Sequence, residues 1–163
     1  MSDKILLRNA TPLDSSAIAD VYLISRKELL YYAPLAHTDS SVRAWIRDTL
    51  IPTNQVTVAV SNGLIVGMMA LSKDEKVGWI DQLYLLPTIV GRGIGSLFVE
   101  FAKTTLSAPI QLHTFQENVR ARKFYERHGF QVIGLSDGST NEEHCPDILY
   151  KWRQYDDRNH HSK

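Results

Sequence analysis

The chain has 163 residues, of which 44% are apolar and 22% charged, the composition of one ordinary globular domain. Its 18 basic and 18 acidic residues balance, which argues against a nucleic-acid partner, and no apolar run approaches the roughly 18 residues of a membrane span. The single cysteine, Cys145, cannot form an internal disulfide, which fits a cytoplasmic protein. We expect one domain over residues 1–155 and a polar, disordered tail over 156–163, whose His160-His161 pair is solvated rather than metal-binding.

The first third of the chain predicts one strand and two helices. Residues 4–9 are typical of a short strand, and Pro12 after them suits the first turn of a helix. Apolar residues at helical spacing extend this helix to about residue 30. A second helix is predicted over 39–50, and Pro52 should end it.

The next part of the chain predicts three strands in succession. Two apolar runs, 56–60 and 64–69, flank Ser61-Asn62-Gly63, and Asn-Gly between two such runs is a strong hairpin signal. A third run, 77–86, ends at Pro87. Strands that follow one another so closely are expected to pair antiparallel.

The remaining elements alternate between helices and strands. A helix from about residue 93 follows the third strand, and after it the pattern predicts a strand at 109–115, a helix at 118–128 and strands at 129–135 and 147–152. The whole order is a mixed α/β class. Its strand–helix–strand crossover should make one parallel, right-handed pair within a mostly antiparallel sheet flanked by about four helices.

Three glycines alternate in the stretch Gly91-Arg92-Gly93-Ile94-Gly95, directly before a helical pattern. A dinucleotide fingerprint needs a sixth-position glycine, where this chain has Ser96 or Phe98, and a nucleotide P-loop needs a lysine that is absent. The pattern that remains is a strand, a glycine turn and a helix N-terminus whose free N–H groups approach a pyrophosphate. Taken alone, the stretch is equally typical of a tight turn without a ligand.

A second motif is the segment NVRARKFYERHGF, residues 118–130. Together the two segments closely resemble the GCN5-related N-acetyltransferase (GNAT) superfamily, whose motifs are R/Q-x-x-G-x-G/A and N-x-x-A-x-x-F-Y-E-x-x-G-F. The second motif is matched at Asn118, Ala121, Phe124, Tyr125, Glu126, Gly129 and Phe130. The first position of the other motif is Val90 here, so a basic or amide side chain is missing and Arg92 is the residue that could compensate.

The resemblance implies the GNAT fold, with a splayed parallel strand pair, and direct acetyl transfer from acetyl-CoA to a primary amine of a small molecule or peptide. It implies no metal. By position, the cofactor's pantetheine would pair with the main chain of the predicted strand 77–86, and its pyrophosphate would lie at the glycine stretch. The cofactor-binding residues so implied are Leu83, Tyr84, Leu85, Val90, Gly91, Arg92, Gly93, Gly95, Ser96, Asn118 and Phe124. An N-cap role is the alternative, or an addition, for Asn118.

Three residues are candidates for catalysis. Tyr125 occupies the place of the family's tyrosine that protonates the departing thiolate, and the alternative is a core tyrosine. Asp81, in an apolar strand where an unpaired carboxylate is costly, is a candidate base or a structural ion pair. His37, between the first two helices, is a second candidate base or a surface residue.

Several features leave alternatives open. The acidic loop 136–143 suits a cationic acceptor but is equally typical of a solvated turn, and direct transfer gives Cys145 no role. A catalytically silent acyl-CoA sensor and a transferase for another acyl-CoA are the competing functions. The sequence allows a monomer or a homodimer.

Overall fold

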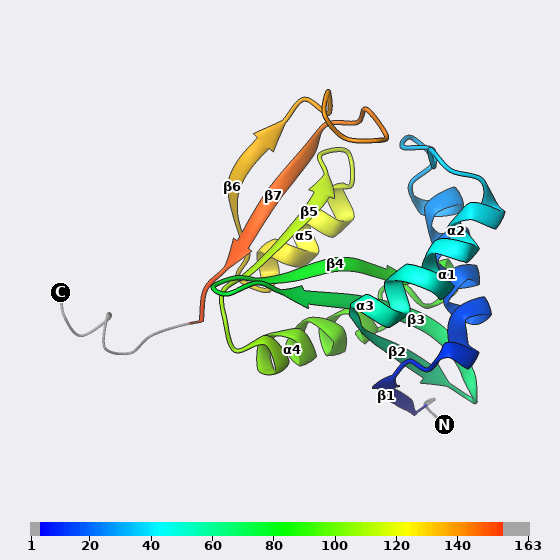
Figure 1. Ribbon diagram of the computed structural model, residues 1–163. Helices are drawn as coiled ribbons and strands as arrows, with labels where there is room; N and C mark the ends of the chain where they lie inside the picture. Colours follow the sequence, from blue (N-terminus) through cyan, green and yellow to red (C-terminus); the bar gives the residue numbers. More distant parts are fainter. Residues whose placement is uncertain (1–3, 155–163) are drawn as a thin grey trace.

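Seven strands form one sheet in the order β1-β2-β3-β4-β5-β7-β6 in the computed structural model, which describes residues 4–154 (Figure 1). All pairs are antiparallel except β4 with β5, so the predicted mixed sheet with one parallel pair is confirmed. The strands are β1 (Ile5–Asn9), β2 (Gln55–Ser61), β3 (Leu64–Lys73), β4 (Gly78–Leu85), β5 (Ile110–Phe115), β6 (Gln131–Ser136) and β7 (Asp147–Trp152). The predicted tail and its histidine pair lie outside the described residues.

The helices also follow the predicted order. They are α1 (Ser15–Leu29), α2 (Asp39–Trp45), α3 (Ile51–Thr53), α4 (Ile94–Leu106) and α5 (Val119–Arg127), with the 3₁₀ turns η1 (Pro12–Asp14) and η3 (Pro87–Ile89). The helix predicted over 39–50 is slightly longer than expected: a π-helical stretch, η2 (Ile46–Leu50), joins α2 to α3, and the helical backbone ends at Thr53, one residue after Pro52. Within residues 4–154 no helix has both the length and the hydropathy to cross a membrane.

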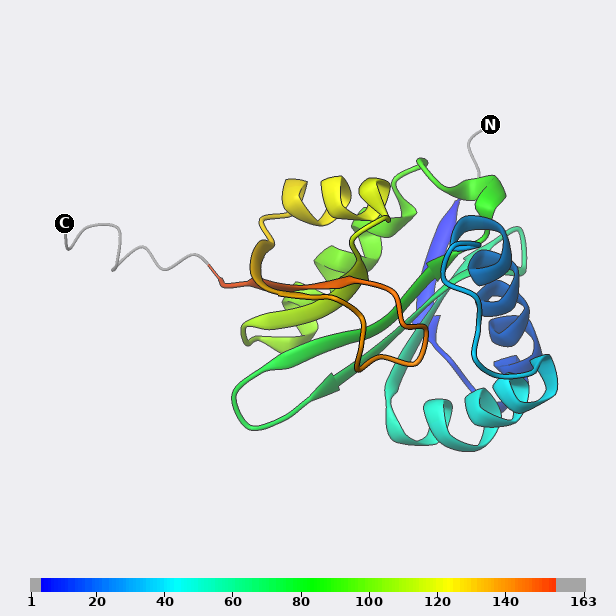
Figure 2. The same ribbon diagram turned by 90° about the horizontal axis from the view of Figure 1, so that it is seen from above.

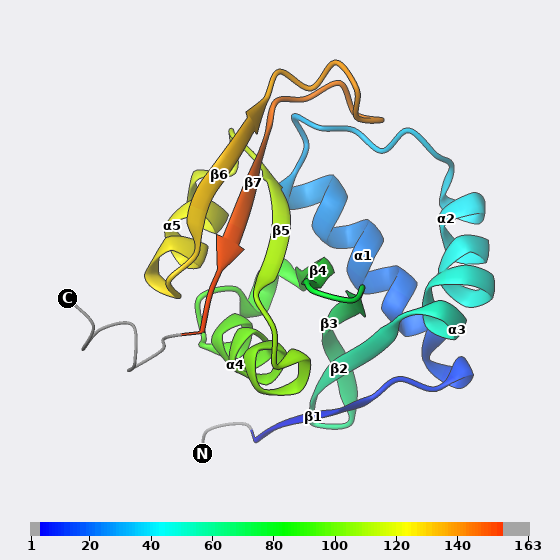
Figure 3. The same ribbon diagram turned by 60° about the vertical axis from the view of Figure 1, so that its left-hand side comes forward.

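Two hydrophobic cores lie on opposite faces of the sheet. Helices α1 to α3 lie on one side of the sheet and α4 and α5 on the other (Figure 2 and Figure 3). Successive side chains of β3 point into opposite cores: Met68 packs with α1 and α2, whereas Met69 packs with α4. Both are fully buried. The sheet is therefore covered on both faces, and β3 is the shared wall.

The hairpin predicted from Asn62-Gly63 is confirmed. Both residues have positive φ, 51° and 77°, which is the geometry that a two-residue turn between twisted strands requires. The turn fixes the register of β2 against β3, and β4 continues the antiparallel run by pairing with β3.

The parallel pairing of β4 with β5 is very short. Only Gly78 and Trp79 of β4 pair with β5, after which the two strands diverge (Figure 1). On the other edge of β4, the pairing with β3 contains a bulge at Asp81, because Ile80 pairs with Leu71 and Gln82 with Ala70. The far part of β4 therefore has a strand partner on one edge only within the described chain.

The start of α1 is anchored to β1 by one carboxylate. Asp14 accepts two hydrogen bonds from the Arg8 guanidinium, at 2.8 and 3.0 Å, and a third from the Thr11 amide at 2.8 Å. These bonds, chiefly those of Arg8, lower the pKa of Asp14 from 3.8 to about 2. The charged form is therefore the one that stabilises the fold.

We predict that Asp14→Asn lowers the free energy of unfolding at pH 7 by about 1 kcal/mol, because it removes the charge that pairs with Arg8. Because the pKa of Asp14 is depressed in the folded protein, its contribution is complete above pH 3.8 and fades as the pH falls toward 2. Urea unfolding at pH 7 and at several values below pH 4 should show the parent and variant converging. Asp20→Asn, which breaks an exposed pair with Arg43, is the control. A difference that persists unchanged below pH 3 would contradict this assignment.

Candidate active site

The glycine loop, residues 90–93, places a bare helix N-terminus at the end of β4. Gly91 and Gly93 have φ of 89° and 86°, which side chains rarely adopt, and α4 begins directly after them. No side chain caps α4. A Cβ added to Gly93 would meet no atom within 4 Å, so open space lies beside the loop. The free N–H groups of the first turn of α4 can therefore meet an anion there.

Three further residues that are predicted to bind the cofactor, Gly95, Phe124 and Asn118, also position α5. Gly95 lies against α5: a Cβ there would be 3.1 Å from Cζ of Phe124, so the glycine permits the close packing of the two helices. The side chain of Asn118 accepts from the Ala121 amide at 3.2 Å, so Asn118 is the N-cap of α5. These contacts place α5 beside the glycine loop.

The hydroxyl of Ser96 lies 2.9 Å from Nε2 of His128, at the end of α5. Burial, followed by the charge of Lys103, lowers the pKa of His128, so its ring is neutral at pH 7. Nδ1 of the same ring lies 3.5 Å from Glu100, which favours a proton on Nδ1 and leaves Nε2 to accept from Ser96. Ser96 therefore offers an anion its main-chain N–H, while its hydroxyl proton is engaged with α5.

The free edge of β4, defined here as the main chain of Leu83 and Leu85, faces away from β3. The Leu86 amide donates to the Val66 carbonyl at 2.9 Å, and antiparallel hydrogen bonding alternates along a strand. Tyr84 therefore bonds to β3 through its main chain, whereas Leu83 and Leu85 direct theirs to the side where β5 has diverged. Of these groups, the Leu85 carbonyl accepts from Ser25 Oγ at 2.6 Å.

Tyr125 lies under this edge, in the core on the α4 side. It is 8% exposed and packs edge-on against Phe124 and Phe130, with ring centroids 5.2 and 5.7 Å away. Leu83 and Leu85 pack against the same core. Burial, with a smaller contribution from Tyr84, raises the pKa of Tyr125 above its ordinary value, so the phenol keeps its proton through the neutral range.

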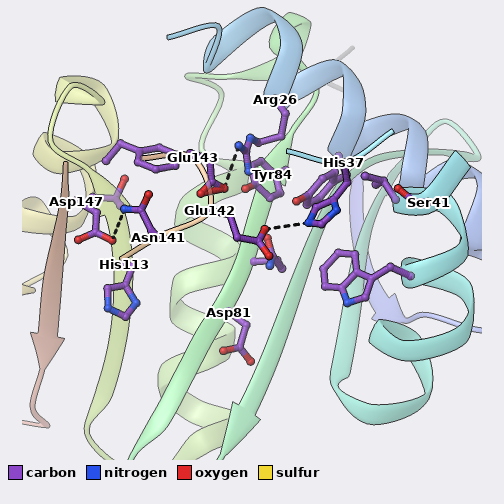
Figure 4. Close-up of a pocket in the computed structure, with 16 residues that line it drawn as sticks. Arg26, His37, Ser41, Asp81, Tyr84, His113, Asn141, Glu142, Glu143 and Asp147 are labelled. Atoms are coloured by element: carbon purple, nitrogen blue, oxygen red, sulfur yellow. Dashed lines mark hydrogen bonds and ion pairs between the residues drawn. The ribbon is translucent and has the colours of Figure 1, made fainter. Parts of the chain in front are cut away.

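A pocket of about 790 Å³ opens on the opposite face of the sheet (Figure 4). Its lining comes from α1, α2 and the connection between them, from β4, β5 and β7, and from the β6–β7 loop, residues 137–146. The polar residues among it are Tyr22, Arg26, His37, Ser41, Asp81, Gln82, Tyr84, His113, Thr114, Asn141, Glu142, Glu143 and Asp147. Tyr84 has two roles here. Its main chain is bonded to β3, and its ring faces the pocket (Figure 4).

Two side-chain contacts cross the pocket from the β6–β7 loop, one an ion pair and the other a hydrogen bond. Glu143 lies 3.4 Å from Nη2 of Arg26 on α1, and Glu142 lies 3.1 Å from Nε2 of His37 (Figure 4). Arg26 is 5% exposed, donates to the Ala33 carbonyl at 3.0 Å and lies over the Phe115 ring. With four carboxylates against one arginine, the lining is acidic overall when its histidines are neutral.

The structure brings the two candidate bases, Asp81 and His37, into this one pocket. Asp81 lies at the bulge, is exposed and accepts from Asn54 Nδ2 at 2.9 Å, and within residues 4–154 it forms no ion pair. His37 is exposed beside Glu142. Tyr125 does not line the pocket, so the predicted acid and the candidate bases lie on different sides of β4.

Sequence reasoning missed several pocket residues. Arg26 interrupts the apolar stripe of the first helix, and a charge at such a position was the available signal. His113 stacks on Trp79 across the start of the β4–β5 divergence, with ring centroids 5.7 Å apart, and nothing local in the sequence marks it. In the part of the chain that the structure describes, no three His, Cys, Asp or Glu side chains gather as a metal site would require.

Cys145 anchors the β6–β7 loop and offers no nucleophile. Asn141 holds its main chain with two hydrogen bonds, at 2.7 and 3.1 Å. The thiol is buried, and burial raises its pKa. Gly138, with φ of 85°, packs directly on the Cys145 main chain, so the loop that carries Glu142 and Glu143 is rigidly folded.

Comparison with known proteins gives one family and several relatives. Residues 20–130 match the acetyltransferase (GNAT) family. The peptidyl-lysine N-acetyltransferase YjaB of Salmonella typhimurium is 35% identical over 72 residues, which are 40% of this chain and 49% of that protein, so the match spans about half of that relative. The uncharacterized N-acetyltransferase YafP of Escherichia coli is 25% identical over 139 residues, 80% of this chain and 84% of that protein.

The fold is also similar to solved structures. The PaiA N-acetyltransferase of Thermoplasma acidophilum, solved in complex with coenzyme A, has a TM-score of 0.75. It is 18% identical, and the match covers 93% of this chain and 99% of that one. At that identity the likeness shows the shared fold.

We predict that Gly138→Ala is much more damaging than Gly63→Ala. Both glycines have positive φ, so alanine costs about 1 kcal/mol of backbone strain at either. At Gly138 the new Cβ would also lie 2.4 Å from the Cys145 main chain, whereas at Gly63 it meets nothing within 4 Å. Overpacking adds about 2 kcal/mol at Gly138. Urea unfolding measures both, and equal losses would contradict the close packing of the β6–β7 loop.

Proposed function

The chain belongs to the GNAT family of acetyltransferases, and from that premise we propose that it transfers an acetyl group from acetyl-CoA directly to a primary amine. One observation carries the proposal. The free edge of β4 lies between a bare helix N-terminus and an acidic pocket, so a bound thioester could meet an amine where the two sides of β4 adjoin.

The residues present fit both the pantetheine and the pyrophosphate of coenzyme A. Pantetheine carries amide groups, and the main-chain groups of Leu83 and the amide of Leu85, which have no strand partner, are the complement that such amides need. The glycine loop and the first turn of α4 would hold the pyrophosphate through main-chain N–H groups. Bound there, acetyl-CoA supplies the activated acyl group.

Tyr125 is proposed as the proton donor to the departing sulfur. When the acceptor nitrogen bonds to the acyl carbon, the carbon–sulfur bond breaks and the thiolate needs a proton. A raised pKa keeps that proton on the Tyr125 phenol at neutral pH. Its place beneath Leu83 and Leu85 puts it on the side of β4 where the thioester would lie.

The proposed acceptor is a small-molecule or peptide amine that arrives as a cation, such as a lysine side chain. Four carboxylates line the pocket, Asp81, Glu142, Glu143 and Asp147, and Arg26 alone opposes them as a permanent cation. The relative from Salmonella is named a peptidyl-lysine N-acetyltransferase, which agrees with this acceptor class. The amine must lose a proton before it attacks, and Asp81 and His37 are the proposed bases.

A thiol-release assay tests the proposal. Acetyl-CoA should give free thiol with lysine-containing peptides or alkyl diamines, and much less with zwitterionic amino acids that lack a second amine, because an acidic pocket disfavours their carboxylate. Succinyl-CoA in place of acetyl-CoA distinguishes another acyl donor. Tight CoA binding with no turnover on any amine would contradict the enzyme and favour a sensor.

We predict that Tyr125→Phe lowers kcat by about 100-fold or more, the usual effect of losing a general acid, while the Kd for CoA changes little. Tyr150→Phe is the matched control, because its ring lies 6.3 Å from that of Tyr125 and its hydroxyl binds Glu126 instead. Because the Tyr125 pKa is raised above 10, any loss of rate between pH 8 and pH 10 should also occur in the variant. Equal effects of the two substitutions on kcat would assign Tyr125 to the core only.

A further inference from the structure

The glycine loop lacks a side chain that its resemblance to the family leads one to expect. Position 90 is commonly Arg or Gln in the motif, and here it is Val90, which cannot contact a phosphate by hydrogen bonding. Main-chain N–H groups remain, but they carry only partial charge. A diphosphate bound at this loop would therefore gain from a cation supplied by another part of the chain.

Arg120, in the first turn of α5, supplies a cation at the right place. Its Nη2 lies 3.1 Å from the position that a Cβ on Gly91 would occupy, so the guanidinium reaches across from α5 to the glycine loop. The N-cap bond of Asn118 fixes the start of α5, two residues earlier. The packing of Phe124 on Gly95 holds α5 against α4. These contacts fix the main chain of Arg120 beside the glycine loop, within reach of its guanidinium.

The guanidinium of Arg120 has no partner of its own. Within residues 4–154 it forms no ion pair and no side-chain hydrogen bond, whereas Arg122, two residues on, donates to the Gln116 carbonyl at 3.2 Å. Arg92, in the loop itself, is equally without an ion pair in the described chain, and both are exposed. Two uncompensated arginines therefore flank the uncapped N-terminus of α4.

We propose that Arg120 binds the pyrophosphate of the CoA thioester and replaces, from α5, the side chain that position 90 lacks. This inference rests on the proposed function. A guanidinium suits the role because its planar N–H groups can bind two phosphate oxygens at once. A lysine ammonium lacks this planar fork and acts as a single point charge. Besides its φ, Gly91 leaves room for Arg120, because a Cβ there would lie only 3.1 Å from Nη2.

Calorimetric titration with CoA tests the assignment. Arg120→Ala should raise the Kd by about tenfold to a hundredfold, the range for losing charged hydrogen bonds, and Arg120→Lys should recover part of it. Lys123→Ala is the matched control, since it removes the same charge from an exposed site on the same helix. The affinity of the Arg120→Ala variant should also depend less steeply on salt than that of the parent. Thermal unfolding checks that each variant is folded.

Two CoA fragments locate the contact. With dephospho-CoA, which lacks the 3′-phosphate, the loss caused by Arg120→Ala should persist, and with pantetheine, which lacks the pyrophosphate, it should vanish. If the loss disappears with dephospho-CoA, or equals that of Lys123→Ala, Arg120 does not bind the pyrophosphate. If the parent itself binds no CoA, the proposed function fails together with this inference, whereas a parent that binds CoA as tightly as its Arg120→Ala variant contradicts this inference alone.

Discussion

The divergence of β4 from β5 is the constraint on which the site depends. Each strand has a full antiparallel partner on its outer edge, β3 and β7, so the pair separates within the sheet after Trp79 rather than at its rim. Main-chain groups at Leu83 and Leu85 are left without a strand partner. An unpaired main-chain group away from water costs about 1–3 kcal/mol, so this edge is a place where a ligand with its own amides is favoured.

Both sides of the proposed reaction are arranged around this one edge. The core beneath α4 and α5 holds Tyr125, and the bare N-terminus of α4 follows β4 after a short turn. The acidic pocket lies on the other face, under α1 and the β6–β7 loop. Tyr84 links the two, because its ring faces the pocket and its main chain lies between Leu83 and Leu85 in β4. Tyr125 and the acidic pocket thus lie on different sides of β4, and the free edge of that strand is where the two sides adjoin.

The sequence predicted the elements well because their signals are local. Asn62-Gly63 marks the hairpin, and alternating glycines before an apolar helical pattern mark the turn into α4. The environment of Asp81 could not be predicted, because a bulge in the pairing with β3 turns that residue outward, and pairing is a long-range property. The same holds for His113, which is brought to Trp79 by the parallel crossover, and for Arg120, whose place depends on how α5 packs on α4.

Amide hydrogen exchange, followed by NMR with and without CoA, tests most directly whether the free edge of β4 binds the cofactor. The account predicts strong protection on CoA binding of the amides of Leu83 and Leu85 and of the first turn of α4. The amide of Tyr84, already bonded to β3, should change little and serves as an internal reference. CoA binding that leaves Leu83 and Leu85 exchanging as fast as before would contradict the account.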